Sequence, residues 1–102
     1  MVKVIGLTRE EKDRRTRFQD MRDIASKIFP EAEIMASSGL LAIRISKPFN
    51  NTLARAGTIY WSELHQDRLS VSHESVLEQG KRLAQVYEDK YKQEFTVKKD
   101  YE

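Results

Sequence analysis

Hydrophobic and polar residues alternate in the middle of this chain, as they do in strands that are buried on one side only. In the best of these runs, Leu41, Ile43 and Ile45 are separated by Ala42 and Arg44. A period of two is typical of a half-buried antiparallel sheet. The runs that show it cover residues 40–46, 58–64 and 68–71, with a weaker run at 33–37. The sequence therefore predicts an antiparallel sheet of about four strands.

The two flanks of this region follow a period near 3.6, which is typical of amphipathic helices. They cover Thr8–Phe29, which ends at Pro30, and a second segment from 72 to 95. Ser72 is positioned to cap the second helix, and Gly80 lies inside it, as expected where a backbone approaches closely. We therefore expect a two-layer α+β fold, with both helices on one face of the sheet.

The connections between the strands are less clearly marked. Ser38 and Gly39 predict a hairpin turn, and residues 65–67 predict another. The stretch 52–57 shows neither period and fits a loop or a single helical turn. Residues 1–7 and 96–102 are expected to form short edge strands or tails, which could pair with each other or with a second copy.

Length and composition exclude several classes of protein. The 102 residues correspond to one domain, and they include no cysteine, which excludes disulfides, thiolate zinc sites and cysteine nucleophiles. Residues 1–7 do not resemble a signal peptide, and no apolar stretch approaches the roughly 20 residues that span a bilayer. We expect a cytoplasmic protein that does not bind a membrane, a metal or a cofactor.

Two histidines are the natural starting point for catalysis. His65 lies near Glu63 and Asp67 in the predicted turn, and His73 precedes Glu74. A carboxylate beside a histidine is what general acid–base chemistry requires, but polar residues are expected in a turn in any case. A small hydrolase-like enzyme at His65 therefore ranks third among our hypotheses, and we predict that the protein is not an enzyme.

A cluster of basic residues in the first helix offers a surface for nucleic acid. Acidic residues are interspersed with it, so an ion-paired, solvated helix is the competing interpretation. Basic residues contact phosphates without sequence preference. The candidate phosphate-binding residues are Arg14, Arg15, Arg17, Arg22, Arg44, Lys47 and Arg55.

The order of elements resembles that of double-stranded-RNA-binding domains, which run helix, three strands, helix. Those domains carry a lysine-rich cluster at the start of their second helix. Here that position reads Ser72-His73-Glu74-Ser75, which holds no lysine. The resemblance covers the order of elements only, and no family is assigned.

A sheet that is covered by helices on one face leaves its other face open. Alternation assigns Trp61 to the core and Tyr60 to the open face, and it places Arg44 there as well. Exposed apolar patches mark contact surfaces in small proteins. Our first hypothesis is therefore a non-enzymatic interaction or regulatory protein, a homodimer or a binder of another protein, that acts through this face and the charged first helix. The candidate partner-binding residues are Leu40, Ala42, Tyr60 and Ser62.

Overall fold

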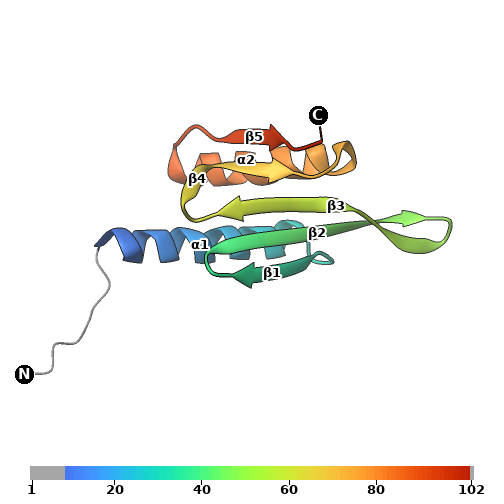
Figure 1. Ribbon diagram of the computed structural model, residues 1–102, viewed down its shortest axis with the longest axis horizontal. Coiled ribbons are helices and arrows are strands. Elements are labelled where there is room, and N and C mark those ends of the chain that lie inside the picture. The colour runs from blue at the N-terminus through green and yellow to red at the C-terminus, as the bar shows by residue number, and fades with distance from the viewer. Residues whose placement is uncertain (1–8, 102) are drawn as a thin grey trace, which may run out of the picture.

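The computed structural model describes residues 9–101, apart from the side chains of Glu10 and Glu11. Over residues 9–101 the chain forms two α-helices, one short 3₁₀ turn (η1) and five strands (Figure 1). In chain order these are α1 (Arg9–Ile28), β1 (Glu33–Ser37), β2 (Leu40–Phe49), β3 (Thr52–Ser62), β4 (His65–Val71), η1 (Glu74–Val76), α2 (Leu77–Tyr91) and β5 (Thr96–Lys99).

The five strands form one mixed sheet in the order β1-β2-β3-β4-β5. Strands β1 to β4 pair with one another in antiparallel fashion, while β5 runs parallel to β4. The predicted α+β class and the order of its elements are confirmed. The edge strand expected within residues 96–102 is present as β5, but it pairs in parallel with β4, which was not the partner expected for it. The strand predicted for residues 1–7 lies outside the described residues.

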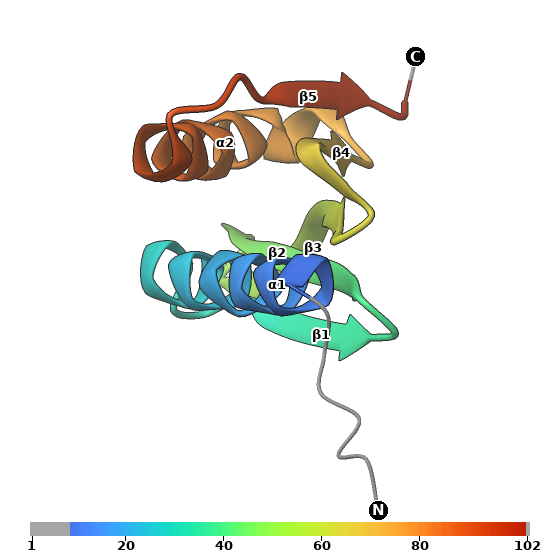
Figure 2. The same cartoon turned by 90° about the vertical axis from the view of Figure 1, so that its left-hand side faces the viewer.

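Both helices lie on the same side of the sheet (Figure 2). The core fills the space between these two layers, and its centre is an aromatic cluster. Trp61 lies between Phe18 of α1 and Tyr87 of α2, with ring centroids 6.1 and 6.0 Å away. Burying these large rings against the aliphatic side chains of the strands stabilises the fold through the hydrophobic effect. The fully buried aliphatic partners include Leu41, Ile43, Ile59, Leu69, Val71 and Leu83.

Three local predictions were wrong. Residues 52–57 belong to β3, not to a loop or a helical turn. Residues 65–67 begin β4, and the turn before them consists of Glu63 and Leu64. Ser72 does not cap a helix, because its hydroxyl instead accepts a hydrogen bond from the backbone N–H of Thr58 at 2.8 Å.

The far part of the β2–β3 hairpin projects beyond the helices as a two-stranded arm, which lies at the right of Figure 1. We call residues 46–55 the arm. It begins at a β-bulge, where the register shifts between Ile45 and Ser46. A bulge bends and twists a strand pair, which turns the arm away from the core. Its tip is a tight turn in which Asn50 and Asn51 adopt positive φ angles of 49° and 66°. Asparagine tolerates this conformation better than most residues do.

Candidate functional site: the open face of the sheet

The face of the sheet away from the helices, which we call the open face, carries one residue from each of the five strands in a continuous row. Strand register fixes this row, because aligned residues of neighbouring strands share a face. Met35 pairs with Ala42, Ala42 with Tyr60, Tyr60 with Ser70, and Ser70 with Lys98. Tyr60 is therefore the central residue of the open face.

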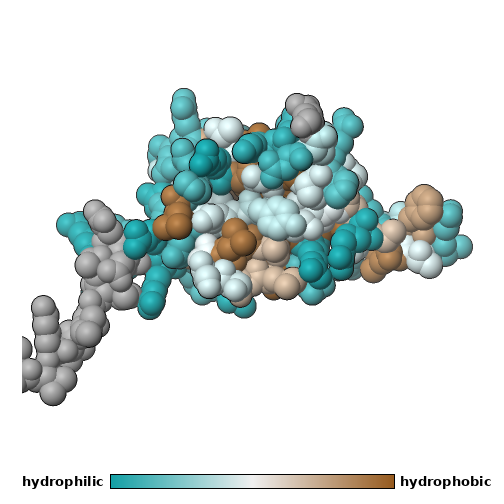
Figure 3. Space-filling view, in the orientation of Figure 1, coloured by the Kyte–Doolittle hydropathy of each residue, from teal (hydrophilic) through white to brown (hydrophobic). Residues whose placement is uncertain are grey.

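Apolar side chains are exposed in the middle of this face. Leu40 is 46% exposed, Met35 44% and Tyr60 41%, whereas Trp61 next to Tyr60 is 1% exposed. Figure 3 views the open face and shows apolar and neutral residues near its centre, with hydrophilic residues around them. A grouped set of exposed apolar residues is more informative than scattered ones, because it marks a surface suited to contact.

A shallow depression lies beside the ring of Tyr60 and has a volume of about 120 Å³. Leu40 and Tyr60 supply its apolar side, and Arg68 and His65 supply polar groups. It is too small for a drug-sized ligand, since such sites measure roughly 300–1,000 Å³. It suits a single side chain or ring that belongs to a larger partner.

Positive charge surrounds this apolar centre. Strand alternation places Arg44, Arg68 and Lys98 on the open face. The acidic residue that the strands place on the same face is Glu33. The Glu33 carboxylate lies 3.7 Å from the guanidinium of Arg44, so this acid is already paired. Residues 40–62, the whole β2–β3 hairpin, contain three basic residues and no acidic residue. The open face is therefore apolar at its centre and cationic at its margins.

The predicted partner-binding residues Leu40, Ala42, Tyr60 and Ser62 all lie on this face. Met35, Arg68 and Lys98 also belong to it, although the sequence reasoning did not select them. The alternation of Arg68 with Leu69 could have placed Arg68 on the open face from the sequence. Nothing in the sequence pointed to Lys98, because its place depends on the parallel pairing of β5 with β4.

The predicted phosphate-binding residues do not form one surface. Arg44 and Arg55 lie on the open side of the sheet, since Arg55 pairs with Ser46 beyond the bulge. Lys47 lies on the helix side, where its ammonium donates a hydrogen bond to the carbonyl of Ser75. Arg15 and Arg22 are exposed on α1, and α1 packs on the opposite face from Arg44.

Two arginines of α1 line a separate polar cavity of about 560 Å³ at the β3–β4 turn. One of them, Arg17, is held in place, because its Nη1 donates to Oε1 of Gln93 at 2.7 Å and its guanidinium lies 4.5 Å from the centre of the Tyr91 ring. Arg17 is therefore part of the packing between the helices. Arg14 lines the same cavity.

The residues proposed for a catalytic site lie around this cavity too. His65, Glu63 and Asp67 all line it. Within residues 9–101, no hydrogen bond joins these three side chains, and no cluster of His, Asp and Glu is suited to hold a metal ion. The other histidine, His73, has its Nδ1 2.7 Å from the hydroxyl of Ser72.

Within residues 9–101, neither helix has the length and apolar character needed to cross a bilayer.

Comparison of the chain with protein-family models, with curated proteins and with solved structures gave no match.

Proposed function

We propose that this protein is a non-enzymatic binding protein, and that it binds an acidic partner protein through its open face. One observation carries the proposal: exposed Met35, Leu40 and Tyr60 lie on one face of three neighbouring strands, around Ala42, and basic residues surround them. Interfaces commonly combine an apolar centre, often with an aromatic anchor, and a polar rim. An apolar side chain of the partner fits the depression beside Tyr60, and partner carboxylates complement the rim.

The charge of the open face favours such a partner over a second copy of the chain. Two copies stacked through this face would bring Arg68 and Lys98 of one copy towards the same basic rim of the other. Like charges across an interface disfavour association, whereas complementary charges speed it and set its specificity. We therefore rank an acidic partner above the homodimer.

Nucleic acid is the second candidate partner. The acid-free hairpin of residues 40–62 favours it, together with the exposed ring of Tyr60 among basic side chains. Proteins that bind single strands stack bases on aromatic rings and hold phosphates with arginine and lysine. In this second proposal, Arg44, Arg55 and Arg68 contact the phosphates. The exposed arginines of α1 are the alternative surface.

The test is selection of binding peptides from a random dodecapeptide display library. We expect the enriched peptides to combine aspartate or glutamate with a large apolar residue. A synthetic peptide of that kind should bind at least about tenfold more weakly to Tyr60→Ala, because a central aromatic anchor is lost. Arg68→Glu should weaken it as well. Leu64→Ala removes an apolar side chain that is 71% exposed in the β3–β4 turn, and it serves as the matched control.

The same variants distinguish the two partners. Labelled single-stranded RNA and duplex DNA are titrated at about 50 mM and about 200 mM salt, where phosphate contacts give a steep loss of affinity. RNA binding that depends on Tyr60, with no enrichment of acidic peptides, would replace the protein partner by nucleic acid. If peptide binding and RNA binding are both equal in Tyr60→Ala and in the unchanged protein, both versions are contradicted.

A further inference from the structure

The outer edge of strand β1 is unpaired within residues 9–101. β1 is the first strand in the order of the sheet, and β2 is its neighbour on the inner side. In Figures 1 and 2 it forms the lower margin of the sheet. The edge of a sheet presents a row of backbone N–H and C=O groups that can pair with another chain. The edge of β1 is therefore a surface suited to the addition of a strand.

β1 lacks the features that commonly protect an edge strand. Lysine, proline and β-bulges hinder edge-to-edge pairing of sheets. The sequence from Glu33 to Ser37 contains no basic residue and no proline, and its register with β2 shows no shift. At the opposite edge of the sheet, β5 carries Lys98 and Lys99. Of the two outermost strands, β1 is therefore the better suited to accept another strand.

The turn after β1 determines which of its backbone groups point outward. Residues 38–39 have positive φ angles of 49° and 79°, as in a two-residue type I′ turn. Such a turn is closed between the C=O of Ser37 and the N–H of Leu40, so the polar groups of Ser37 point towards β2. Because these groups alternate in direction along a strand, those of Ile34 and Ala36 point to the free edge.

A second copy of β1 matches this edge when the two strands run antiparallel about Met35. In that register Met35 lies opposite Met35 of the second copy, and Ile34 lies opposite Ala36 of the second copy. The outward N–H and C=O groups of Ile34 and Ala36 then pair with one another, and the two Met35 residues form a non-hydrogen-bonded pair. Apolar residues thus face apolar residues along the centre of the interface, which stabilises strand pairing.

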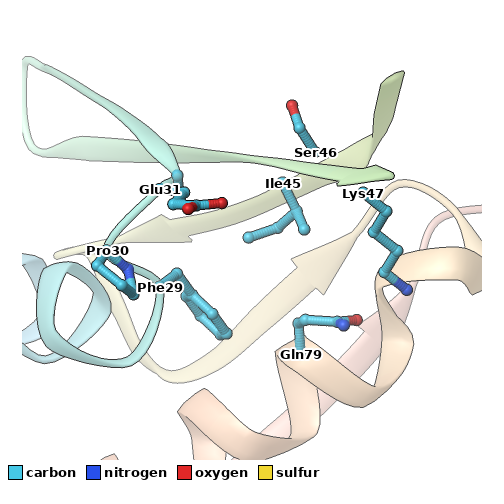
Figure 4. Close-up of a pocket in the computed structure, with 8 residues that line it drawn as sticks. Phe29, Pro30, Glu31, Ile45, Ser46, Lys47 and Gln79 are labelled. Atoms are coloured by element: carbon cyan, nitrogen blue, oxygen red, sulfur yellow. The ribbon is translucent and has the colours of Figure 1, made fainter. Parts of the chain in front are cut away.

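The acidic residues at β1 favour a second copy over an acidic strand. Glu33 would lie opposite Ser37 of the second copy, whose hydroxyl can donate to the carboxylate, so no two like charges meet. Figure 4 shows Glu31 just before β1, beside a cavity of about 250 Å³ that Phe29 and Ile45 line on the helix side. Glu31 is exposed. A strand rich in aspartate or glutamate would meet these carboxylates, and like charges oppose association.

We propose that the protein dimerises through the edge of β1, which joins two five-stranded sheets into one continuous sheet. Met35, which is 44% exposed in one copy, is then covered by its counterpart. The row of Tyr60, Ala42 and Met35 continues into the same row of the second copy. Unlike the stacking of two open faces, this dimer keeps Arg68 and Lys98 of the two copies apart. It does not rest on the proposed function, because the edge and the open face are different surfaces.

Disulfide formation tests both the dimer and its register, since the chain contains no cysteine of its own. Met35→Cys should give a disulfide-linked dimer under mild oxidation, because the Cα atoms of a non-hydrogen-bonded pair lie about 4.5 Å apart, within the span of a disulfide. Ser37→Cys is the matched control, since it is exposed on the same face but would lie about 14 Å from its counterpart. We expect at least about tenfold more linked dimer from Met35→Cys at equal concentrations.

Two lysine substitutions separate pairing of the edges from any other association. Ala36→Lys places a charge opposite Ile34 of the second copy, so the dissociation constant should rise at least about fivefold, because the change acts twice at a twofold interface. Ser37→Lys adds the same charge one residue away but opposite Glu33, so it should leave the dimer intact or tighten it. Ala36→Pro is the second disrupting variant, because it removes an outward N–H without affecting the pairing with β2.

Sedimentation equilibrium over about a hundredfold range of protein concentration measures each dissociation constant. A monomer across this range, or an equal loss in Ala36→Lys and Ser37→Lys, would overturn the proposal. Linkage of Ser37→Cys that matches that of Met35→Cys would also contradict it, because the register about Met35 would be absent. A dimer that depends on Ala36, in a chain that selects no acidic peptide, would support edge pairing and contradict the proposed function.

Discussion

The hydroxyl of Tyr91, the last residue of α2, donates a hydrogen bond to the carboxylate of Asp20 in α1. The ammonium of Lys90 lies 3.0 Å from the same carboxylate oxygen. The hydrogen bond from Tyr91 and the nearby charge of Lys90 lower the pKa of Asp20 below its ordinary value of 3.8, although burial acts in the opposite direction. Burial and the negative charge of Asp20 raise the pKa of Tyr91. These polar contacts tie the two helices together at the edge of the aromatic core.

Asp20→Asn should therefore lower stability at neutral pH but not in acid. Because the pKa of Asp20 is lower in the folded state, its ionised form stabilises the protein fully above the unfolded value of 3.8, and this contribution is lost as the pH falls through the folded pKa. We expect a loss of about 1 kcal/mol near neutral pH, and a gap between variant and unchanged protein that closes below about pH 4.

Urea unfolding at several pH values measures this gap directly. Asp23→Asn is the matched control, since Asp23 is exposed in the next turn of the same helix and accepts a hydrogen bond from Gln19 at 3.0 Å, with no contact to α2 among the described residues. A gap for Asp20→Asn that stays constant down to pH 3 would show that the carboxylate charge does not stabilise the folded state.

Arg17→Ala should destabilise the fold, whereas Arg15→Ala should not. The guanidinium of Arg17 stacks on Tyr91 and donates to Gln93, so its removal should cost about 1 kcal/mol. Arg15 is exposed, and its removal should change the stability by less than about 0.5 kcal/mol. Thermal unfolding of the two variants makes the comparison, and equal stabilities would remove Arg17 from the packing. Tests of phosphate binding by α1 are therefore better made with Arg14, Arg15 and Arg22 than with Arg17.

The open face was predictable because its strands are buried on one side only. A strand with one buried face must place its apolar residues at every second position, so Leu41, Ile43 and Ile45 identify both faces at once. The same rule separated the buried ring of Trp61 from the exposed ring of Tyr60. The predicted partner-binding residues Leu40, Ala42, Tyr60 and Ser62 follow from this alternation, whereas Lys98 does not.

The arm and the pairing of β5 with β4 were not predictable in the same way, although an edge strand was expected within residues 96–102. The arm extends past the core, so neither of its faces is buried and no alternation marks it as a strand pair. The pairing of β5 with β4 depends on how α2 packs across the sheet, which is a nonlocal property of the fold.

Gly80→Ala should destabilise the protein, although alanine favours a helix by about 1 kcal/mol over glycine. A Cβ atom at this position would lie 2.6 Å from Cγ1 of Val71 and 3.4 Å from Cδ1 of Leu69. The close approach expected at Gly80 is thus made to side chains of β4, and β-branched Val71 has little freedom to move aside. We expect a net loss of about 1–2 kcal/mol, since overpacking a core costs more than the gain in propensity.

A double-mutant cycle with Val71→Ala tests this explanation. In the Val71→Ala background the contact is relieved, so Gly80→Ala should become neutral or stabilising there. If Gly80→Ala costs the same in both backgrounds, then crowding against Val71 is not the reason for glycine at this position.

Leu53→Ser should weaken the binding of an acidic partner, whereas Phe49→Ser should not. Both side chains are 65% exposed on the arm, so neither change should alter the stability by more than about 0.5 kcal/mol. They differ in direction: Leu53 pairs with Pro48 on the side that continues the open face through Arg55 and Arg44, and Phe49 projects to the other side. Leu53 precedes Tyr60 by seven positions in β3, which corresponds to about 23 Å. An extended dodecapeptide reaches about 40 Å, so it can contact both Leu53 and Tyr60.

The affinities of the selected peptide for Leu53→Ser and Phe49→Ser test this prediction. An equal loss of affinity in both variants would mean that the partner contacts both sides of the tip of the arm. No loss of affinity in Leu53→Ser would confine the contact to the strands around Tyr60.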